Sequence, residues 1–301
     1  MEKSKLIYSY FFLILATALW GGNIIAAKIA SMIGLEPIKL SFYRNFVVII
    51  ILLPFIINKI YFLYVIFLKN WKIITILSIF GVSIFNVFMN IALTSSSVIS
   101  SSLMPSFAPS MIIILSLIIY NSKISLLQFV GIIISFIGFI NIIIRGNIVN
   151  LGALNFVAGD IWMLACVSCW ALYSVMLRKI PKEIDNISFL FLIFLVGNFF
   201  LIPFFIFESY TNNSFLLNEE YSFLLVLYVG IGPALISFLL WIKAIKVIGA
   251  NKSGLFLNLI PVFSSIISII FLNETMELFH IVGAFLIFIG IYLVIRQNQN
   301  G

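Results

Sequence analysis

Residues 7–31 read IYSYFFLILATALWGGNIIAAKIAS, an apolar run interrupted by a single charge. A helix of about 20 apolar residues crosses the hydrocarbon core of a bilayer. Lys3 and Lys5 precede the run, and Ala16-Thr17-Ala18 is similar to a signal-peptidase site. The apolar stretch nevertheless continues to Ala27, which is too far for the hydrophobic region of a signal peptide. The sequence therefore predicts a retained first membrane-spanning helix.

The composition of the whole chain agrees with a lipid environment. Of the 301 residues, 63% are apolar and 9% are charged, and the mean hydropathy is +1.24. Soluble domains are roughly 45–50% apolar and about 25% charged, and a globule of this size could not bury so much apolar surface. A sizeable soluble domain, a disordered chain and a disulfide scaffold are excluded. At about 20 residues per helix and ~10 per connection, the length accommodates about ten spans.

Ten segments are apolar enough and long enough to span. They are 7–31, 37–57, 71–92, 97–120, 124–144, 157–178, 187–208, 221–244, 252–272 and 278–295. Their continuous apolar runs exclude a transmembrane barrel, in which lipid-facing and polar residues alternate. Within lipid, a helix satisfies its own backbone groups. We therefore expect an all-α integral membrane protein with ten transmembrane helices.

Basic residues are distributed unequally between the connections. If the N-terminus is cytoplasmic, cytoplasmic segments contain Lys3, Lys5, Lys59, Lys69, Lys72, Lys123, Arg178, Lys179, Lys182, Lys243, Lys246, Lys252 and Arg296. The external segments contain only Lys39 and Arg145. Positive charge accumulates on the cytoplasmic side of membrane proteins. This pattern predicts a multi-pass protein of the cytoplasmic (inner) membrane with both termini in the cytoplasm.

The two halves of the sequence resemble each other. A shift of 152 residues carries Ala92 onto Ala244, Ser101 onto Ser253, Pro109 onto Pro261, Gly131 onto Gly283 and Gly138 onto Gly290. The halves, residues 1–148 and 149–301, each contain five predicted spans. Because five is odd, the second half would cross the membrane in the opposite sense. We therefore expect a 5+5 inverted-topology repeat with a substrate path between the halves near the midplane.

Four motifs, in order, resemble the EamA-like family of the drug/metabolite transporter superfamily. They are Leu19-Trp20-Gly21-Gly22-Asn23 followed by Lys28, Phe42-Tyr43-Arg44, Cys169-Trp170-Ala171-Leu172-Tyr173-Ser174, and Leu272-Asn273-Glu274 followed by Gly283 and Gly290. The resemblance covers almost the whole chain. It implies ten helices, a central cavity between two five-helix repeats and transport of small organic solutes. It does not imply one substrate.

Three charged residues stand out inside the predicted spans: Lys28, Arg44 and Asp160. Charges within the membrane are costly and are candidates for function. In the predicted topology all three lie in its outer part, where they could meet in a binding or gating cluster. The two cations would hold a carboxylate or phosphate, and Asp160 would hold an amine or balance an arginine. A structural ion pair, or Lys28 reaching toward the headgroups, is the alternative.

Other polar and aromatic residues are candidates for the walls of the cavity. The predicted fourth helix contains Ser101, Pro105 and Pro109, and its repeat partner contains Asn258 and Pro261. Small hydroxylated residues also allow close helix packing, which is the alternative role for these two helices. Proline frees backbone carbonyls, which are tolerated where they line a cavity. Further candidates for substrate contacts are Trp20, Asn23, Asn90, Trp170 and Tyr173.

Several residues belong to types that often have functional roles, but the sequence around them does not support such roles. Cys166 and Cys169 lie in an apolar run without the charges or further ligands of a redox or zinc site. His280, the only histidine, is expected at the membrane interface. The glycines at 131, 138, 283 and 290 are expected on packing surfaces, within the chain or between protomers. No ATP-binding loop is present, and no cofactor or metal is expected.

The leading hypothesis is a secondary transporter of small metabolites such as amino acids, with export as the first choice of direction. Uptake or exchange of a charged metabolite such as S-adenosylmethionine is the alternative. A membrane enzyme acting on a lipid substrate is disfavoured by the shortage of histidine and intramembrane carboxylates. We expect a small-molecule substrate, a bilayer, no nucleic acid partner, and a monomer or homodimer. Asp160 is the best candidate for proton coupling.

Overall fold

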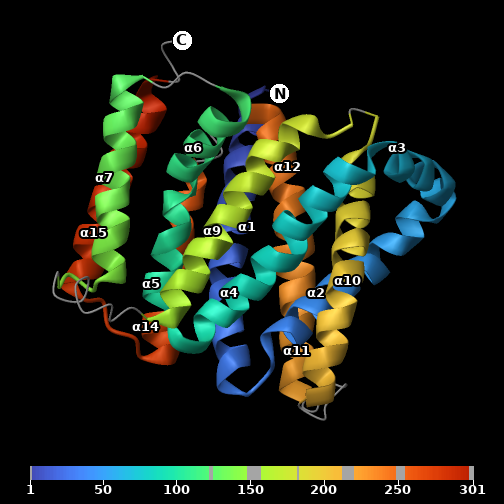
Figure 1. Ribbon diagram of the computed structural model, residues 1–301, viewed down its shortest axis with the longest axis horizontal. Helices are drawn as coiled ribbons and strands as arrows, with labels where there is room; N and C mark the ends of the chain where they lie inside the picture. The colour runs from blue at the N-terminus through green and yellow to red at the C-terminus, as the bar shows by residue number, and fades with distance from the viewer. Residues whose placement is uncertain are drawn as a thin grey trace.

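The computed structural model describes residues 2–121, 125–147, 157–181, 183–211, 220–248 and 255–297, and every regular element among them is helical (Figure 1). The α-helices of the first half are α1 (Glu2–Met32), α2 (Pro37–Ile56), α3 (Ile60–Ser78), α4 (Ile84–Ser95), α5 (Val98–Leu103), α6 (Ala108–Tyr120) and α7 (Leu126–Ile143). Those of the second half are α9 (Ala158–Met176), α10 (Asn186–Thr211), α11 (Glu220–Val229), α12 (Ser237–Ile248), α14 (Leu259–Leu272) and α15 (Leu278–Gln297).

Short segments of 3-10 and π-helix interrupt or join these helices. The 3-10 segments are η1 (Ile57–Lys59), η3 (Met104–Phe107), η4 (Leu177–Lys179) and η6 (Leu255–Asn258). The π-helical segments are η2 (Ile79–Ser83) and η5 (Gly230–Ile236). π-Helical turns are rare and occur often at functional sites.

The helices have the length and composition of membrane spans. Seven helical stretches in the described part of the chain are long and apolar enough to cross a bilayer, and two shorter apolar helices, Phe256–Leu272 and Leu278–Leu293, accompany them. One of the seven, Pro37–Ser95, contains α2, α3 and α4 in succession. Inside α3, Asn70 has non-helical backbone angles (φ −123°, ψ 22°), and Figure 1 shows the chain turning at α3 between α2 and α4.

The outside of the bundle is apolar, and its interior combines two hydrophobic clusters with buried polar side chains. Phe55, Phe199, Phe207 and Phe271 are exposed on the outside, whereas Asn23, Arg44, Asn86, Asn90 and Asp160 are buried. An outside rich in large apolar side chains is expected where lipid surrounds the chain.

Helices α7 and α15 form a close antiparallel pair, which Figure 1 shows at the left edge of the bundle. Ser135 Oγ donates to the Ile287 carbonyl at 3.3 Å, and Asn141 Nδ2 donates to the Phe279 carbonyl at 3.0 Å. The glycines at positions 138 and 283 face each other between these contacts. The glycine faces expected from the sequence therefore pack against each other within the chain.

Local irregularities recur at nearly the same offset as the sequence repeat. Asn121 and Asn273 both adopt left-handed backbone conformations, with φ of 50° and 53°, and their numbers differ by 152. The π-helical segment η2, shifted by 152 residues, falls inside η5, and the 3-10 segment η3 falls one residue beyond η6. Caps also begin individual helices: Pro37 opens α2, and the Ser97 side chain accepts a hydrogen bond from the Ser100 N–H at the start of α5.

Candidate functional site

A cavity lies inside the bundle. Its walls come from α1, α2, α4, α9 and α12, together with the interrupted helices η3–α6 and η6–α14. The cavity contains about 100 Å³ of space that the centre of a water-sized sphere can reach. Five of the residues predicted from the sequence line it: Trp20, Asn23, Arg44, Pro105 and Trp170. The other lining residues are Ile24, Phe85, Met89, Ala108, Met163, Cys166, Val167, Phe238, Leu257 and Ile260. Most of the wall is therefore apolar or aromatic, as in typical small-molecule sites.

Arg44 contributes a positive charge to this wall. It lies on α2 and is 4% exposed. Its Nη1 donates a hydrogen bond to Asn86 Oδ1 on α4, and its Nε has no partner among the described residues. The ion pairs found in the described part of the chain involve other cations. Since arginine stays protonated in proteins, the cavity wall contains a buried cation that has no counter-ion among the described residues.

Aromatic rings surround the remaining space. The rings of Phe85 and Trp170 lie 5.1 Å apart, and those of Trp20 and Phe238 lie 5.8 Å apart at nearly right angles. The Trp20 Nε1 donates to the carbonyl of Pro233 in η5 at 3.0 Å. The indole is therefore held by a carbonyl of a π-helical segment, and its ring remains available to a ligand.

Lys28 and Asp160 do not line the cavity but meet at Ser96, near the end of α4. Lys28 Nζ donates to the Leu93 carbonyl at 3.0 Å and to the Ser96 carbonyl at 2.9 Å. Ser96 Oγ donates to Asp160 Oδ1 at the start of α9. The predicted triad is therefore divided: Lys28 and Asp160 share one partner, whereas Arg44 pairs with Asn86 elsewhere.

The other predicted site residues occupy the walls and the packing behind them. Asn90 Nδ2 donates to Ser41 Oγ at 3.0 Å and to the Pro37 carbonyl at 3.2 Å, which ties α4 to the start of α2. Ser101 is buried on α5, and Tyr173 is buried beside the ring of Trp170. Asn258 lies at the end of η6 and Pro261 lies in α14, and neither is among the lining residues, whereas Pro109 lies in the first turn of α6.

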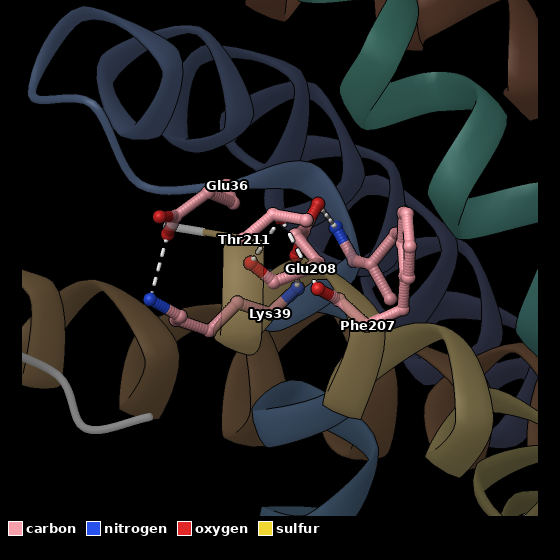
Figure 2. Close-up of polar contacts among 6 residues, drawn as sticks. Glu36, Lys39, Phe207, Glu208 and Thr211 are labelled. Carbon is pink, nitrogen blue, oxygen red and sulfur yellow. Dashed lines mark hydrogen bonds and ion pairs between the residues drawn. The ribbon is translucent and has the colours of Figure 1, made fainter. Parts of the chain in front are cut away.

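Two carboxylates, one of them in the Leu272-Asn273-Glu274 motif, join helices at the end of the bundle opposite the termini. Glu208 on α10 accepts hydrogen bonds from the backbone N–H groups of Ile38 (3.3 Å) and Lys39 (2.7 Å), as Figure 2 shows. Lys39 in turn forms an ion pair with Glu36 at 2.8 Å. Carboxylates at helix N-termini satisfy unpaired N–H groups and interact favourably with the helix dipole.

Glu274 makes the corresponding contact on the other side of the bundle. It accepts from the N–H groups of Val98 (2.8 Å) and Ile99 (3.0 Å) at the start of α5. His280 accepts at Nδ1 from the Glu277 N–H, so Nε2 carries the hydrogen that it shares with Ser100 Oγ at 2.9 Å. The contacts of Glu274 with α5 and of His280 with Ser100 join residues more than a hundred positions apart, and no local sequence pattern indicates these partners.

The model of the EamA-like transporter family matches this chain twice, at residues 7–144 and 157–296. The chain belongs to the EamA-like transporter family. The resemblance predicted from its four motifs is confirmed, and the chain is a multi-pass membrane protein of this family.

Several known proteins resemble the chain along most of its length. An uncharacterized transporter of Archaeoglobus fulgidus is 24% identical over 97% of this chain and 99% of its own. The uncharacterized transporters YetK and YyaM of Bacillus subtilis are 25% identical over 97% of the chain and 29% identical over 74%, covering 88% and 72% of their own lengths. One solved crystal structure shares the fold, with a TM-score of 0.56 and 16% identity over 99% of this chain and 98% of that one.

Proposed function

We propose that this protein is a secondary transporter that moves small organic metabolites across the cytoplasmic membrane by alternating access through the central cavity. The observation that carries the proposal is that both family matches contribute residues to the cavity wall. Residues such as Arg44 and Pro105 come from the first family match, and residues such as Trp170 and Ile260 come from the second. A site between two repeats can be opened to either side when one repeat moves against the other.

The proposed architecture has ten spans in two inverted sets of five, residues 1–148 and 149–301. The stretch Pro37–Ser95 would cross twice, because the chain turns at η1 and at Asn70. The recurring π-helical, 3-10 and left-handed positions support the repeat. The start of α1 and the end of α15 lie at one end of the bundle (Figure 1), and the basic residues on that end favour a cytoplasmic location for both.

Amino acids or related metabolites are the substrates we propose, with export as the direction. The cavity is small, and one positive charge faces a mainly apolar and aromatic surface. Asn23 adds a polar side chain to the wall. The substrate-contacting residues in this proposal are Arg44, Asn23, Trp20 and Trp170. A cationic metabolite such as S-adenosylmethionine is disfavoured, because no carboxylate belongs to the described wall.

The test is transport by the purified protein in proteoliposomes. Uptake and counterflow would be measured against a panel of amino acids, nucleosides and S-adenosylmethionine. We expect counterflow of at least one amino acid, and we expect Arg44→Ala to reduce it at least about tenfold, the scale of one lost charge-assisted contact. Lys72→Ala, which removes a cation above the Trp71 ring, is the matched control and should transport normally. Full activity of Arg44→Ala would contradict the proposed site.

A further inference from the structure

Arg44 and Asn86 form an oriented pair in the cavity wall. Asn86 accepts from Arg44 Nη1 and donates through Nδ2 to the carbonyl of Val82 in η2. This second bond uses the amide nitrogen of Asn86. The amide oxygen is therefore the atom that meets the guanidinium. One side of the guanidinium is therefore held in place, while Nε remains without a partner among the described residues.

No carboxylate among the described residues of the cavity wall neutralises the charge of this pair. Lys28, the other cation of the predicted cluster, is bound by two backbone carbonyls and does not belong to this wall. Asp160 is bonded to Ser96 and does not line the cavity either. A buried charge is expensive unless it is paired, so a ligand that supplies one negative charge would stabilise the site.

The remainder of the wall indicates what the rest of this ligand is like. Phe85, Met89, Met163, Trp170 and Phe238 present apolar or aromatic surface. One cation matches a singly charged anion, whereas a doubly charged phosphate would leave a net negative charge in an apolar site. Arginine also matches the planar geometry of a carboxylate.

We propose that Arg44, oriented by Asn86, binds the carboxylate of an organic acid whose side chain is small and apolar. This inference rests on the proposed transport function and narrows its substrate class to amino acids with apolar side chains and the corresponding acids that lack the amino group. Arg44 contacts the substrate, and Asn86 is a positioning residue.

The test is equilibrium binding to the purified full-length protein by titration calorimetry. The probes are 4-methylpentanoate, its neutral isostere 4-methylpentanamide, 4-methylpentan-1-amine and L-leucine. We expect the acid to bind at least about tenfold more tightly than the amide, because a charge-assisted contact is lost in the amide. We expect the amine to bind more weakly still. Equal affinities for acid and amide, or no binding of the acid at millimolar concentration, would overturn the proposal.

Two substitutions connect this preference to the pair. Arg44→Gln should abolish the difference between acid and amide, whereas Arg44→Lys should retain part of it because the charge remains. Asn86→Asp has almost the same shape but places a carboxylate against Arg44, which should displace the ligand's carboxylate and abolish the preference. Lys72→Gln, on the outside of the bundle, is the control for loss of a positive charge. An unchanged preference in folded Arg44→Gln or Asn86→Asp protein would contradict the assignment.

Transport of the same probes separates this inference from the proposed function. Selective binding of the acid without transport of any probe or panel compound would support the anion site and contradict the transporter. Transport of panel compounds with no preference for the acid in binding would support the transporter and overturn the anion site.

Discussion

Gly138 and Gly283 pack backbone against backbone where α7 crosses α15. A Cβ atom at position 138 would lie 2.7 Å from the Gly283 carbonyl oxygen, and one at position 283 would lie 3.0 Å from the Gly138 carbonyl oxygen. Small residues permit this close approach of membrane helices, whose association depends on packing rather than on a hydrophobic force. The contact joins the last helix of one family match to the last helix of the other.

Gly138→Ala should therefore destabilise the protein by about 1–3 kcal/mol, the usual scale of overpacking. Its Cβ would meet backbone atoms of α15, which cannot move aside independently. Gly232→Ala is the control, because its Cβ would lie 3.3 Å from the flexible end of Leu19. The melting temperature of each variant in detergent, taken from the loss of monodisperse protein on heating, measures the difference in stability. Equal melting temperatures for the two variants would contradict the packing role.

Lys28 and Asp160 should be energetically coupled through Ser96. Lys28→Met leaves the carbonyls of Leu93 and Ser96 without their cation, and Asp160→Ala leaves Ser96 Oγ without its acceptor. Each change should cost about 1–3 kcal/mol, since it leaves buried polar groups unsatisfied. Unfolding measurements on both single variants and the double variant should give a coupling energy above about 0.5 kcal/mol. Strict additivity would show that the two residues act independently.

The role of Asp160 in transport is tested by Asp160→Asn, which preserves an acceptor for Ser96 and removes the charge. Asp160 is 2% exposed and outside the cavity wall, so we expect the variant to bind the acid probe normally. A change in the pH dependence of transport, measured in proteoliposomes, would assign Asp160 to proton coupling. Unchanged transport and an unchanged pH profile would exclude that role.

Asp185 should contribute to stability over nearly the whole accessible pH range. Burial opposes its ionisation, but Lys59 and the N–H and hydroxyl groups of Ser188 hold the pKa of this carboxyl at about 2, below its ordinary value of 3.8. A depressed pKa in the folded protein gives stability that is present above pH 3.8 and is lost as the pH falls through about 2.

The matched variants are Asp185→Ala and Lys59→Met. Asp185 also accepts from the backbone N–H groups of Ile187 (3.1 Å) and Ser188 (3.0 Å) at the start of α10, so Asp185→Ala should cost about 1 kcal/mol as a lost helix cap. Lys59→Met removes only the exposed ion pair at 2.8 Å and should cost less than half of that. Melting temperatures at pH 7 and pH 4.5 should show the same ranking, and a larger loss for Lys59→Met would contradict it.

The membrane class, the all-helical fold and the family could be predicted from the sequence because they depend on local and periodic features, whereas the predicted count of ten spans stays a prediction. An apolar run as long as residues 7–31 is expected to form a membrane-spanning helix. Trp20, Arg44 and Trp170 could also be identified as candidates for the cavity wall, because a charge or a large aromatic residue stands out in an apolar helix.

The partners of these residues were not predictable. Asn86 is one of several polar residues in its helix, and its pairing with Arg44 depends on how α2 and α4 cross. No functional role for Cys166 was predicted from the sequence, yet the structure places it in the cavity wall. The sequence predicted one cluster of three charges because the depth of a residue in the membrane can be estimated from a sequence. Its position around the bundle cannot. Ser253, which is part of the repeat argument, lies outside the described residues.

Glu274 is predicted to keep the cavity closed on the side opposite the termini. Its carboxylate holds the first two N–H groups of α5, which leads through η3 to Pro105 in the cavity wall. Glu274→Gln leaves a single oxygen for two N–H groups, so one charge-assisted bond is lost, and a contact of this kind is worth about 1.5–3 kcal/mol. The population open on that side should therefore increase about tenfold or more.

Cys166 provides the measurement, because it lines the cavity and Cys169→Ser makes it the only thiol of the chain. In this background, Glu274→Gln should accelerate labelling of Cys166 by a membrane-impermeant maleimide added on the side opposite the termini. Labelling from the other side should not accelerate. The control is Glu277→Gln, the same substitution at a neighbouring exposed position. Equal acceleration from both sides would mean that the substitution loosens the whole bundle, because a contact that closes one side affects access from that side alone.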